Sequence, residues 1–270
     1  MTGKMQIRDA IPTDKTSVLD FCKETFSWGD YISDVWDYWI LEGKLLVIEE
    51  DNNPIGLCHA SFFPKRQAWI EGIRIHPKYR NQGYGRRLIL HAESIAQTNS
   101  CKIARMIIEN ENKISLKLAH SIGYYIEDRW RLYYLVPKKQ IASVSFASDG
   151  KQVVNLISSN TYANSWKWLP AEKSDIKELI NKKRVLVSLQ NGSVLAVGIW
   201  NVSEHFASTL QLGLINGTQN GINDILHFMQ NMGHELGYQR IQVFCQEKIH
   251  LQMADLDKRA LFCLMRKDLR

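Results

Sequence analysis

The sequence predicts an α/β protein, with a mixed sheet of the α+β kind, in which one fold occurs twice. The chain has 270 residues, which is more than a single hydrophobic core usually supports. Between residues 6 and 136, apolar runs typical of strands alternate with segments of helical periodicity, and this interleaving indicates a layered sheet. A similar order of patterns returns roughly 140 residues later, which points to a duplication.

The first half opens with a strand and two helices. Gln6–Arg8 is the strand, and Pro12-Thr13-Asp14 has the composition of a helix start, so the first helix runs through Phe21. A second helix covers Ser33–Leu41. The remaining predicted elements are strands at Lys44–Glu50, Pro54–Phe62 and Trp69–His76, a helix at Gly85–Gln97, a strand at Ala104–Ile108, a helix at Lys113–Ser121 and a strand at Trp130–Val136.

The second half follows a polar segment. Residues 137–150 contain few large apolar side chains, so we expect a linker at 138–150 between domains at 1–137 and 151–270. Leu186-Val187-Ser188 and Val194-Leu195-Ala196 repeat the earlier strand pair, and the helix and strand within Ile225–Phe244 repeat the next helix and strand. Chance sharing of a strand–helix pattern is the alternative explanation.

Composition limits the class of protein. Hydrophobic residues make up 45% and charged residues 23%, as in soluble globular chains, and no apolar run is long enough to span a bilayer. The sequence starts without an apolar signal segment, so a cytoplasmic location and no membrane partner are expected. A net charge of +6 permits an anionic ligand, but over this length it does not indicate nucleic-acid binding.

Cysteine spacing argues against a disulfide framework or a structural zinc site. The five cysteines are odd in number, widely scattered and never arranged as CxxC. We expect reduced, mostly buried thiols. They are Cys22, Cys58, Cys101, Cys245 and Cys263.

The stretch Trp69–Leu88, WIEGIRIHPKYRNQGYGRRL, contains the most informative motif. A strand leads into the turn Arg80-Asn81-Gln82-Gly83-Tyr84-Gly85, and an amphipathic helix follows. A glycine-containing turn at a helix N-terminus presents unpaired backbone N–H groups, and the helix dipole adds positive charge. The glycines also let a ligand approach the backbone. The motif therefore favours phosphate binding, while capping of an ordinary helix is the alternative.

In this context the string resembles motif A of the GNAT (GCN5-related N-acetyltransferase) superfamily, (Q/R)xxGxG/A. His76-Pro77-Lys78-Tyr79 is similar to the V-x-P-x-Y-R that precedes this motif in the family. Asn112-x-x-Ser115-x-x-Leu118 and then Ser121–Tyr124 are similar to its NxxAxxLYxxxGF. The resemblance covers residues 6 to 136, and it implies the acyl-CoA N-acyltransferase fold.

The resemblance implies acetyl-CoA as co-substrate and no metal. The fourth strand would pair with the pantetheine arm as an added strand does, and the turn amides would hold the pyrophosphate. Two polar side chains downstream would lie near the thiol. The residues expected to bind acetyl-CoA are Ile73, Arg74, Ile75, Arg80, Asn81, Gln82, Gly83, Tyr84, Gly85, Arg86, Asn112 and Ser115.

Acetyl transfer to an amine requires a base, because only the neutral amine has a lone pair to attack. Glu71 is the first candidate, since it lies on the same strand face as Ile73 and Ile75. The alternative role of Glu71 is an ion pair with an arginine. Glu109, at the end of the next strand, is the second candidate.

The acid that protonates the leaving thiolate is harder to assign. The family's tyrosine position is filled by Ala119. Tyr124 is the candidate we retain, although it stands where the family has a packing phenylalanine. The other available groups are His120, Tyr125 and Tyr133.

The acceptor is expected beside the segment between the first two helices. Trp28, Asp30 and Tyr31 combine aromatic rings with a carboxylate, which suits an amine. Trp36 and Trp39 share one face of the second helix and are expected in the core. The GDY–W pattern is similar to that of histidine Nα-acetyltransferase-like proteins, which makes an amino acid or peptide α-amine a plausible acceptor.

The second half lacks the RxxGxG string. Its counterpart, Gly213 to Gly221, has glycines at another spacing and no arginine. We therefore predict a degenerate GNAT-like domain that does not bind acetyl-CoA, in a monomer or homodimer. The function predicted is an N-acetyltransferase acting on a primary amine of a metabolite, amino acid or peptide. A protein N-terminal or lysine acetyltransferase and a non-catalytic acyl-CoA sensor are the alternatives.

Overall fold

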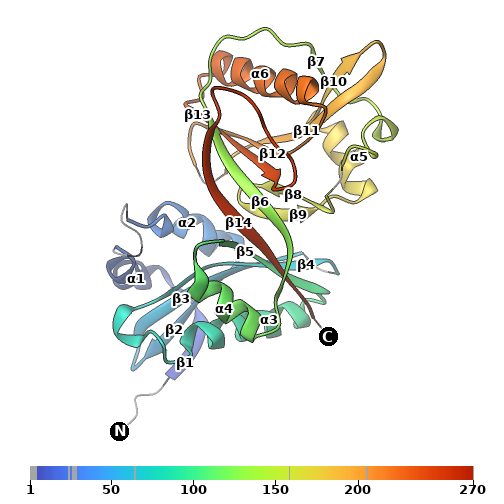
Figure 1. Ribbon diagram of the computed structural model, residues 1–270. Helices are drawn as coiled ribbons and strands as arrows, with labels where there is room; N and C mark the ends of the chain where they lie inside the picture. Colours follow the sequence, from blue (N-terminus) through green and yellow to red (C-terminus); the bar gives the residue numbers. More distant parts are fainter. Residues whose placement is uncertain are drawn as a thin grey trace. The chain divides into compact units, whose positions relative to one another are not determined.

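The structure is a computed structural model that describes residues 5–23, 25, 29–63, 65–157, 159–204 and 206–269. It contains two compact units, whose strands and helices are labelled in Figure 1. The first unit extends to Ile107 and also includes Lys113–Ile126 and the chain from Met265 onward. The second unit consists of Ile108–Asn112 and Glu127–Leu264.

The first unit contains a mixed sheet whose strands are antiparallel except for the last pair. The strands are β1 (Met5–Asp9), β2 (Lys44–Glu50), β3 (Asn53–Phe63), β4 (Gln67–Ile75) and β5 (Ile103–Glu109), with β5 parallel to β4. The helices are α1 (Lys15–Cys22), α2 (Ile32–Glu42), α3 (Tyr84–Thr98) and α4 (Lys113–Ser121), with short 3-10 helices at Pro12–Asp14 (η1) and Pro77–Tyr79 (η2). These bounds confirm the predicted elements to within a few residues.

Strand β2 shows why the sheet is covered on both faces. Its apolar run is buried at consecutive positions, as expected of a strand with helices on either side. Leu45 and Val47 pack against α1 and α2, in the cluster that contains Trp36 and Trp39. Both tryptophans are 1% exposed, which confirms the prediction that they are core residues.

The second unit repeats the strand order of the first. Its elements are β6 (Tyr125–Leu135), β7 (Val144–Phe146), η3 (Gly150–Gln152), β8 (Thr161–Asn164), β9 (Lys167–Pro170), α5 (Lys173–Asn181), β10 (Val185–Gln190), β11 (Ser193–Val202), β12 (Thr209–Gly217), α6 (Gln219–Glu235), β13 (Arg240–Gln246) and β14 (Asp257–Asp268). Strands β10, β11 and β12 are antiparallel and β13 is parallel to β12, as in the series β2 to β5. Helix α6 stands between β12 and β13, as α3 does between β4 and β5. The predicted duplicated fold is confirmed.

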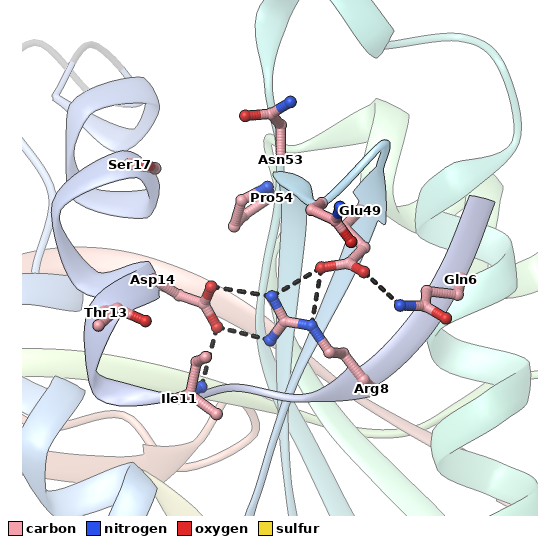
Figure 2. Close-up of a pocket in the computed structure, with 10 residues that line it drawn as sticks. Gln6, Arg8, Ile11, Thr13, Asp14, Ser17, Glu49, Asn53 and Pro54 are labelled. Atoms are coloured by element: carbon pink, nitrogen blue, oxygen red, sulfur yellow. Dashed lines mark hydrogen bonds and ion pairs between the residues drawn. The ribbon is translucent and has the colours of Figure 1, made fainter. Parts of the chain in front are cut away.

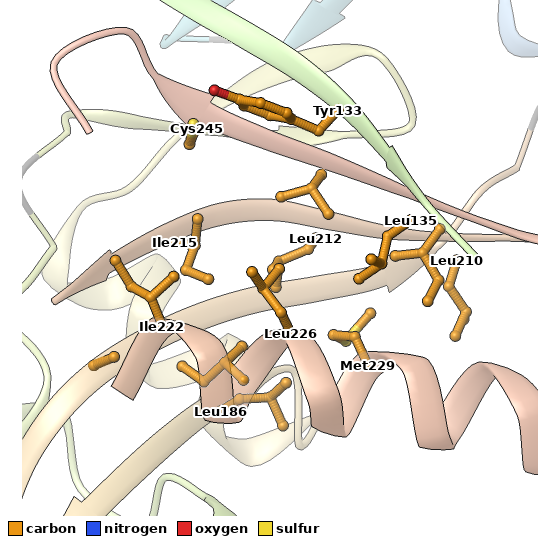
Figure 3. Packing of buried hydrophobic residues seen from close by; sticks show 14 residues of the cluster. Tyr133, Leu135, Leu186, Leu210, Leu212, Ile215, Ile222, Leu226, Met229 and Cys245 are labelled. Carbon is orange, nitrogen blue, oxygen red and sulfur yellow. The ribbon is translucent and has the colours of Figure 1, made fainter. Parts of the chain in front are cut away.

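Helix α6 supplies much of the core of the second unit. Ile222, Leu226 and Met229 lie on one face of the helix and point toward Leu212 and Ile215 of β12 (Figure 3). All five side chains are at most 2% exposed. At about 25 cal/mol per Å², burial of such side chains provides the main stabilisation of a helix on a sheet.

The predicted linker is not free of structure. Its residues Val144–Phe146 form β7, which pairs antiparallel with β10. β10 therefore gains the neighbour that β1 provides for β2 in the first unit. The division into domains at 1–137 and 151–270, with separate roles, stays a prediction.

Each unit contains a segment from the other half of the chain. β6 ends the first half of the chain, yet from Glu127 onward it belongs to the second unit and pairs with β13, where Leu135 lies opposite Ile241. The last residues of the chain belong to the first unit, where the Leu269 amide donates to the Lys102 carbonyl over 2.8 Å. No pattern within a single segment of the sequence reveals this exchange.

The cysteines are buried, as predicted. None of the five is part of a disulfide among the described residues, and each is at most 4% exposed. Burial raises the pKa of the Cys22 and Cys245 thiols to about 12 each. Both thiols are therefore protonated and unreactive at neutral pH.

Candidate functional site

Strand β4 contains a bulge at its centre. On the partner strand β3, His59 lies opposite Glu71 and Leu57 lies opposite Arg74, so β4 holds one residue more than β3 between these pairs. Gly72 occupies the bulge with φ of +66°, and a Cβ there would lie 2.5 Å from the Trp39 ring. The bulge therefore requires glycine, and it changes the direction of the neighbouring side chains.

Beyond the bulge, one edge of β4 is open. The parallel ladder between β4 and β5 joins Gln67 to Ile103 and Trp69 to Arg105, and it ends there among the described residues. The following part of β4 continues to pair with β3 as far as Ile75. The backbone of Ile73 to Ile75 is thus held by β3 on one side. On the other side, beyond the end of the β5 ladder, the Ile73 and Ile75 carbonyls accept from the side chains of Arg74 and Arg80, and an extended ligand chain can lie along this edge.

The turn after β4 leads into α3 with its backbone amides unpaired. Among the described residues, none of the N–H groups from Asn81 to Arg86 has a hydrogen-bond acceptor. Gly83 is the N-cap of α3 and no side chain caps the helix. The unpaired amides and the helix dipole together provide a binding site for a phosphate group.

Gly83 and Gly85 differ in whether the backbone conformation itself requires glycine. Gly83 has φ of +82°, a left-handed conformation that favours glycine, and a Cβ there would meet nothing within 4 Å. Gly85 needs no such conformation, and a Cβ there would make ordinary contacts of 3.5 Å with Leu118 and 3.8 Å with Ile73. Nothing in the protein itself therefore excludes a side chain at Gly85.

The arginines of the turn are arranged around it. The Arg80 Nε donates to the Ile75 carbonyl over 3.1 Å, and the Arg86 Nη1 donates to the Ser121 carbonyl over 3.4 Å. Gln82 donates to the Lys78 carbonyl over 3.2 Å. These contacts fix an exposed turn next to the α3 N-terminus. Tyr84 and Gly85, by contrast, are half-buried.

Arg74 contacts the segment that is predicted from the sequence to bind the acceptor. Its Nε lies 2.6 Å from Oδ2 of Asp30 and its Nη2 lies 3.0 Å from Oδ1, while its guanidinium stacks 5.2 Å from the centre of the Tyr31 ring. Burial alone would lower the pKa of Arg74, but Tyr31 and Asp30 outweigh it and raise this pKa. Asp30 is held by Arg74 with its side chain only 3% exposed. Trp28 lies outside the described residues.

Glu71 contacts a histidine rather than an arginine. Its Oε1 lies 3.0 Å from Nδ1 of His59, and its side chain is 11% exposed. His59 is fully buried and stacks on Trp39 with ring centres 4.5 Å apart and an interplanar angle of 6°. The other ring nitrogen, Nε2, lies 3.5 Å from Oε2 of Glu42. Sequence reasoning missed His59 and Glu42, because the β3–β4 register brings His59 to Glu71 and helix α2 brings Glu42 to His59.

Tyr124, the predicted acid, lies in a buried position. Tyr124 is 2% exposed, and burial, followed by the charge of Glu93, raises its pKa well above 10. Lys267 pairs with Glu93 over 2.6 Å and lies 5.8 Å from the centre of the Tyr124 ring. Such a tyrosine is a poor proton donor. Ala119, at the family's tyrosine position, is 1% exposed.

Glu109 and Asn112 are exposed residues of the turn that follows β5. The Asn112 amide donates to the Glu109 carbonyl over 2.9 Å, so the two are joined through the backbone. Ser115 is half-buried in the first turn of α4. The roles predicted for these three residues stay predictions.

A pocket of about 400 Å³ lies in the first unit, between β1, η1 and the β2–β3 turn. Figure 2 shows Arg8 between two carboxylates, with its Nη1 2.7 Å from Asp14 and its Nε 2.7 Å from Glu49. Gln6 also donates to Glu49. Burial raises the pKa of Asp14, but its bonds from Arg8 and the Ile11 amide outweigh this and leave the pKa below its ordinary value. Because its charged groups pair with one another, we assign this pocket a structural role.

In the second unit, the junction between β12 and α6 is closed. A Cβ at Gly217 would lie 2.3 Å from the Leu195 carbonyl oxygen, and one at Gly221 would lie 2.7 Å from the Leu195 Cβ. The N-cap residue Thr218 accepts from the Gly221 amide over 3.3 Å and donates its own amide to the Leu195 carbonyl over 2.8 Å. Protein atoms therefore fill the space beside this junction, and the amides of Thr218 and Gly221 have acceptors there.

The aromatic residues of the second unit pack against protein. Trp168 is fully buried against Trp130 and Phe244, and Trp166 stacks edge-on against Phe244. The Trp200 indole donates to the Lys183 carbonyl over 3.0 Å. Among the described residues, no group of three or more potential metal ligands comes together, and no helix is long and apolar enough to cross a membrane.

Comparison with known proteins identifies the family that the first half of the chain matches. Residues 14–124 match the model of the Acetyltransferase (GNAT) family. No curated protein sequence matches the chain. The predicted resemblance is thus confirmed, since these residues form a GNAT domain that contains β4, the turn and α3.

Solved structures extend the likeness to the whole chain. A GCN5-related N-acetyltransferase from Sphaerobacter thermophilus has a TM-score of 0.66 at 12% identity, covering 98% of this chain and 96% of that one. A protein from Thermoplasma acidophilum classed as an acetyltransferase has a TM-score of 0.67 at 14% identity, covering 97% and 99%. A tandem GNAT protein from the clavulanic acid biosynthesis pathway has 0.58 at 11% identity and covers 99% of both chains. The chain therefore has the fold of a tandem GNAT protein.

Proposed function

We propose that this protein is an acetyl-CoA-dependent N-acetyltransferase that acts on a primary amine through its first unit. The observation that carries the proposal is the open junction between β4 and α3, where unpaired amides from Asn81 to Arg86 follow, after η2, on the part of β4 that lies beyond the β5 ladder. A pyrophosphate joined to an extended arm matches this arrangement of anion site and strand edge.

The residues present fit acetyl-CoA. The α3 N-terminus and the turn arginines would hold its phosphates, and the backbone of Ile73 to Ile75 would bind its pantetheine arm. The absence of a side chain at Gly85 leaves room for the ligand where the protein alone would tolerate a Cβ. When bound, acetyl-CoA supplies the acetyl group as a thioester.

Glu71 is the proposed base of the reaction. It lies beside the β4 bulge with part of its side chain accessible, and His59 holds one of its carboxylate oxygens. Glu71 would remove a proton from the ammonium group of the acceptor, so that the neutral amine can attack. Backbone N–H groups at the bulge would stabilise the oxyanion that forms.

Calorimetric titration with acetyl-CoA, followed by measurement of thiol release with an amine panel, tests the proposal. The panel comprises amino acids, peptides with free α-amines or lysine side chains, polyamines and 2-phenylethylamine. We expect one acetyl-CoA site per chain, and thiol release with at least one amine. Two sites would contradict the degenerate second domain, and no binding would contradict the proposed function.

Two matched variants distinguish the candidate bases. Glu71→Gln should lower kcat about 100-fold and leave the Kd for acetyl-CoA nearly unchanged, because the amide keeps the shape but accepts no proton. Glu109→Gln should retain the wild-type kcat. The opposite result would assign the base to Glu109.

One observation favours a second candidate, a non-catalytic acyl-CoA sensor. The family's tyrosine position is a buried alanine, Ala119, and the nearest substitute, Tyr124, is itself buried. Binding of acetyl-CoA at one site without thiol release across the amine panel would support the sensor. The enzyme remains the first proposal because a thiolate leaves more readily than an amine and needs less help from an acid.

We also propose that the second unit does not bind acetyl-CoA, because its β12–α6 junction is closed by Thr218 and Gly221. We further propose that the protein is cytoplasmic, that it is a monomer or homodimer, and that its ligands are acetyl-CoA and an amine. Acetylation of peptides but not of small amines would shift it to a protein N-terminal or lysine acetyltransferase.

A further inference from the structure

His59 of β3 is held on three sides by groups that fix its orientation. Its ring stacks on Trp39 at an interplanar angle of 6°. Its Nδ1 lies 3.0 Å from Oε1 of Glu71, and its Nε2 lies 3.5 Å from Oε2 of Glu42. Rotation of the ring by half a turn would place a carbon against Glu71, so these contacts select one orientation.

Helix α2 supplies two of these three contacts. Trp39 and Glu42 are three residues apart and therefore lie on the same side of the helix. Trp39 also covers the bulge of β4, where a Cβ at Gly72 would lie 2.5 Å from its ring. A single helical turn thus fixes both the imidazole and the strand that carries Glu71.

The charges indicate which way the hydrogen bond runs. Glu71 and Glu42 are carboxylates, which accept hydrogen bonds when ionised, so the ring nitrogen that faces Glu71 must donate. A buried donor of this kind fixes one carboxylate oxygen and leaves the other free to face a ligand. Ser61 similarly donates to Oε1 of Glu42 over 3.1 Å, which positions the outer carboxylate.

We propose that His59 is a positioning residue for acetyl transfer, which acts by donating from Nδ1 to Glu71 and so directs the free oxygen of this base toward the amine. Trp39 holds the imidazole in the plane that this requires, and Glu42 lies beside Nε2 without a hydrogen bond to it. The inference rests on the proposed function, since it assigns a role in the same reaction. It involves no net proton transfer through the ring.

Two substitutions separate the two ring nitrogens. In His59→Asn, the side-chain amide lies near the place of Nδ1 and can still donate to Glu71. In His59→Gln, the amide lies near the place of Nε2 and can reach only toward Glu42. We expect His59→Asn to keep kcat within about threefold of the wild type and His59→Gln to lose about 30-fold, because misplacement of a catalytic group is costly.

Both variants should bind acetyl-CoA with the wild-type Kd, since neither touches the turn at α3. Thermal unfolding measures any loss of stability separately. If the role of His59 were purely structural, His59→Asn should not have a higher kcat than His59→Gln, because asparagine leaves the larger cavity in this fully buried site.

A double-mutant cycle gives a second test that does not depend on the asparagine variant. If His59 acts through Glu71, then His59→Gln should reduce kcat no further in the Glu71→Gln background. Asp37→Asn is the matched control on the same helix, since Asp37 is exposed and pairs with Lys15. It should leave kcat unchanged.

The assay measures thiol release from acetyl-CoA with the same amine panel for every variant. Equal kcat values for His59→Asn and His59→Gln, or additive losses in the double mutant, would overturn the positioning role while the wild type remains active. Failure of the wild type to release thiol with any amine would instead contradict the proposed function, and the positioning role with it.

Discussion

The two strand–helix junctions of this protein have the same topology and opposite surroundings. At the first, between β4 and α3, Gly83 has free space around it, and the amides that follow are unpaired among the described residues. At the second, between β12 and α6, Gly217 and Gly221 lie against backbone and side chains, and Thr218 caps the helix. One junction is arranged for a ligand and the other for packing.

The difference shows that glycine content alone does not identify a phosphate site. The second junction contains glycines because neighbouring chain segments approach too closely for any other residue. The first contains Gly85 although the protein would accommodate a Cβ there. A glycine that the fold itself does not require is better evidence for a ligand than one that it does.

The largest effect should come from filling the second junction. Gly217→Ala places a methyl group 2.3 Å from the Leu195 carbonyl oxygen, which the backbone can relieve only by moving. We expect the free energy of unfolding to fall by about 3 kcal/mol. Gly85→Ala is the control, and it should unfold at nearly the wild-type temperature in a calorimetric scan. Equal stabilities for the two variants would remove the distinction between the junctions.

The next effect concerns ligand binding at the first junction. Gly85→Glu places an anion next to the α3 N-terminus, where we propose the pyrophosphate binds. We expect the affinity for acetyl-CoA to fall at least about 100-fold, which corresponds to about 2.7 kcal/mol, in a folded protein.

Asn220→Glu provides the matched control at the exposed first turn of α6. It should leave acetyl-CoA affinity unchanged in the same titration. A folded Gly85→Glu protein that binds acetyl-CoA normally would disprove the site assignment.

A buried carboxylate distinguishes the Asp14 site of the first unit from the α6 core of the second. Asp14 in the first unit is 6% exposed and its pKa is lowered, whereas the α6 core of the second unit is apolar. A lowered pKa means that Asp14 stabilises the fold above about pH 4, its ordinary range, and that this contribution disappears as the pH falls through the folded-state value.

Asp14→Asn should therefore cost about 2 kcal/mol at neutral pH, and the difference from the wild type should shrink in acid. Denaturant unfolding at a series of pH values measures this. Asp37→Asn, at an exposed ion pair, should change stability little throughout. If the unfolding free energies of Asp14→Asn and the wild type differed by the same amount at all pH values, the lowered pKa assigned to Asp14 would be wrong.

The smallest expected effect concerns the two helix caps. Thr218→Ala removes the side chain that accepts from the Gly221 amide, and we expect a loss of about 1 kcal/mol in unfolding free energy. Gly83→Ala should cost a similar amount for a different reason, because φ there is +82°. Added phosphate should stabilise the wild type and Thr218→Ala equally, since the proposed anion site lies at the other helix.

Local patterns allowed most of the fold to be predicted. Each of these patterns lies within one short segment, as the apolar runs of β2 and β3 and the glycine turn before α3 show. The sequence alone was therefore sufficient to predict them. The Arg74–Asp30 pair and the Glu71–His59 contact join different elements, and the bulge at Gly72 shifts the register on which they depend. Simple alternation of side chains along a strand therefore could not have located His59.

The strand exchange between the units has a consequence for synthesis of the protein. The first unit includes the chain from Met265 onward, where Lys267 forms an ion pair with Glu93 of α3. While the ribosome is still translating the second half, the first unit thus lacks its closing segment. The proposed catalytic unit can be completed only after the residues from Met265 onward have been translated, so a product truncated before Met265 cannot assemble it fully.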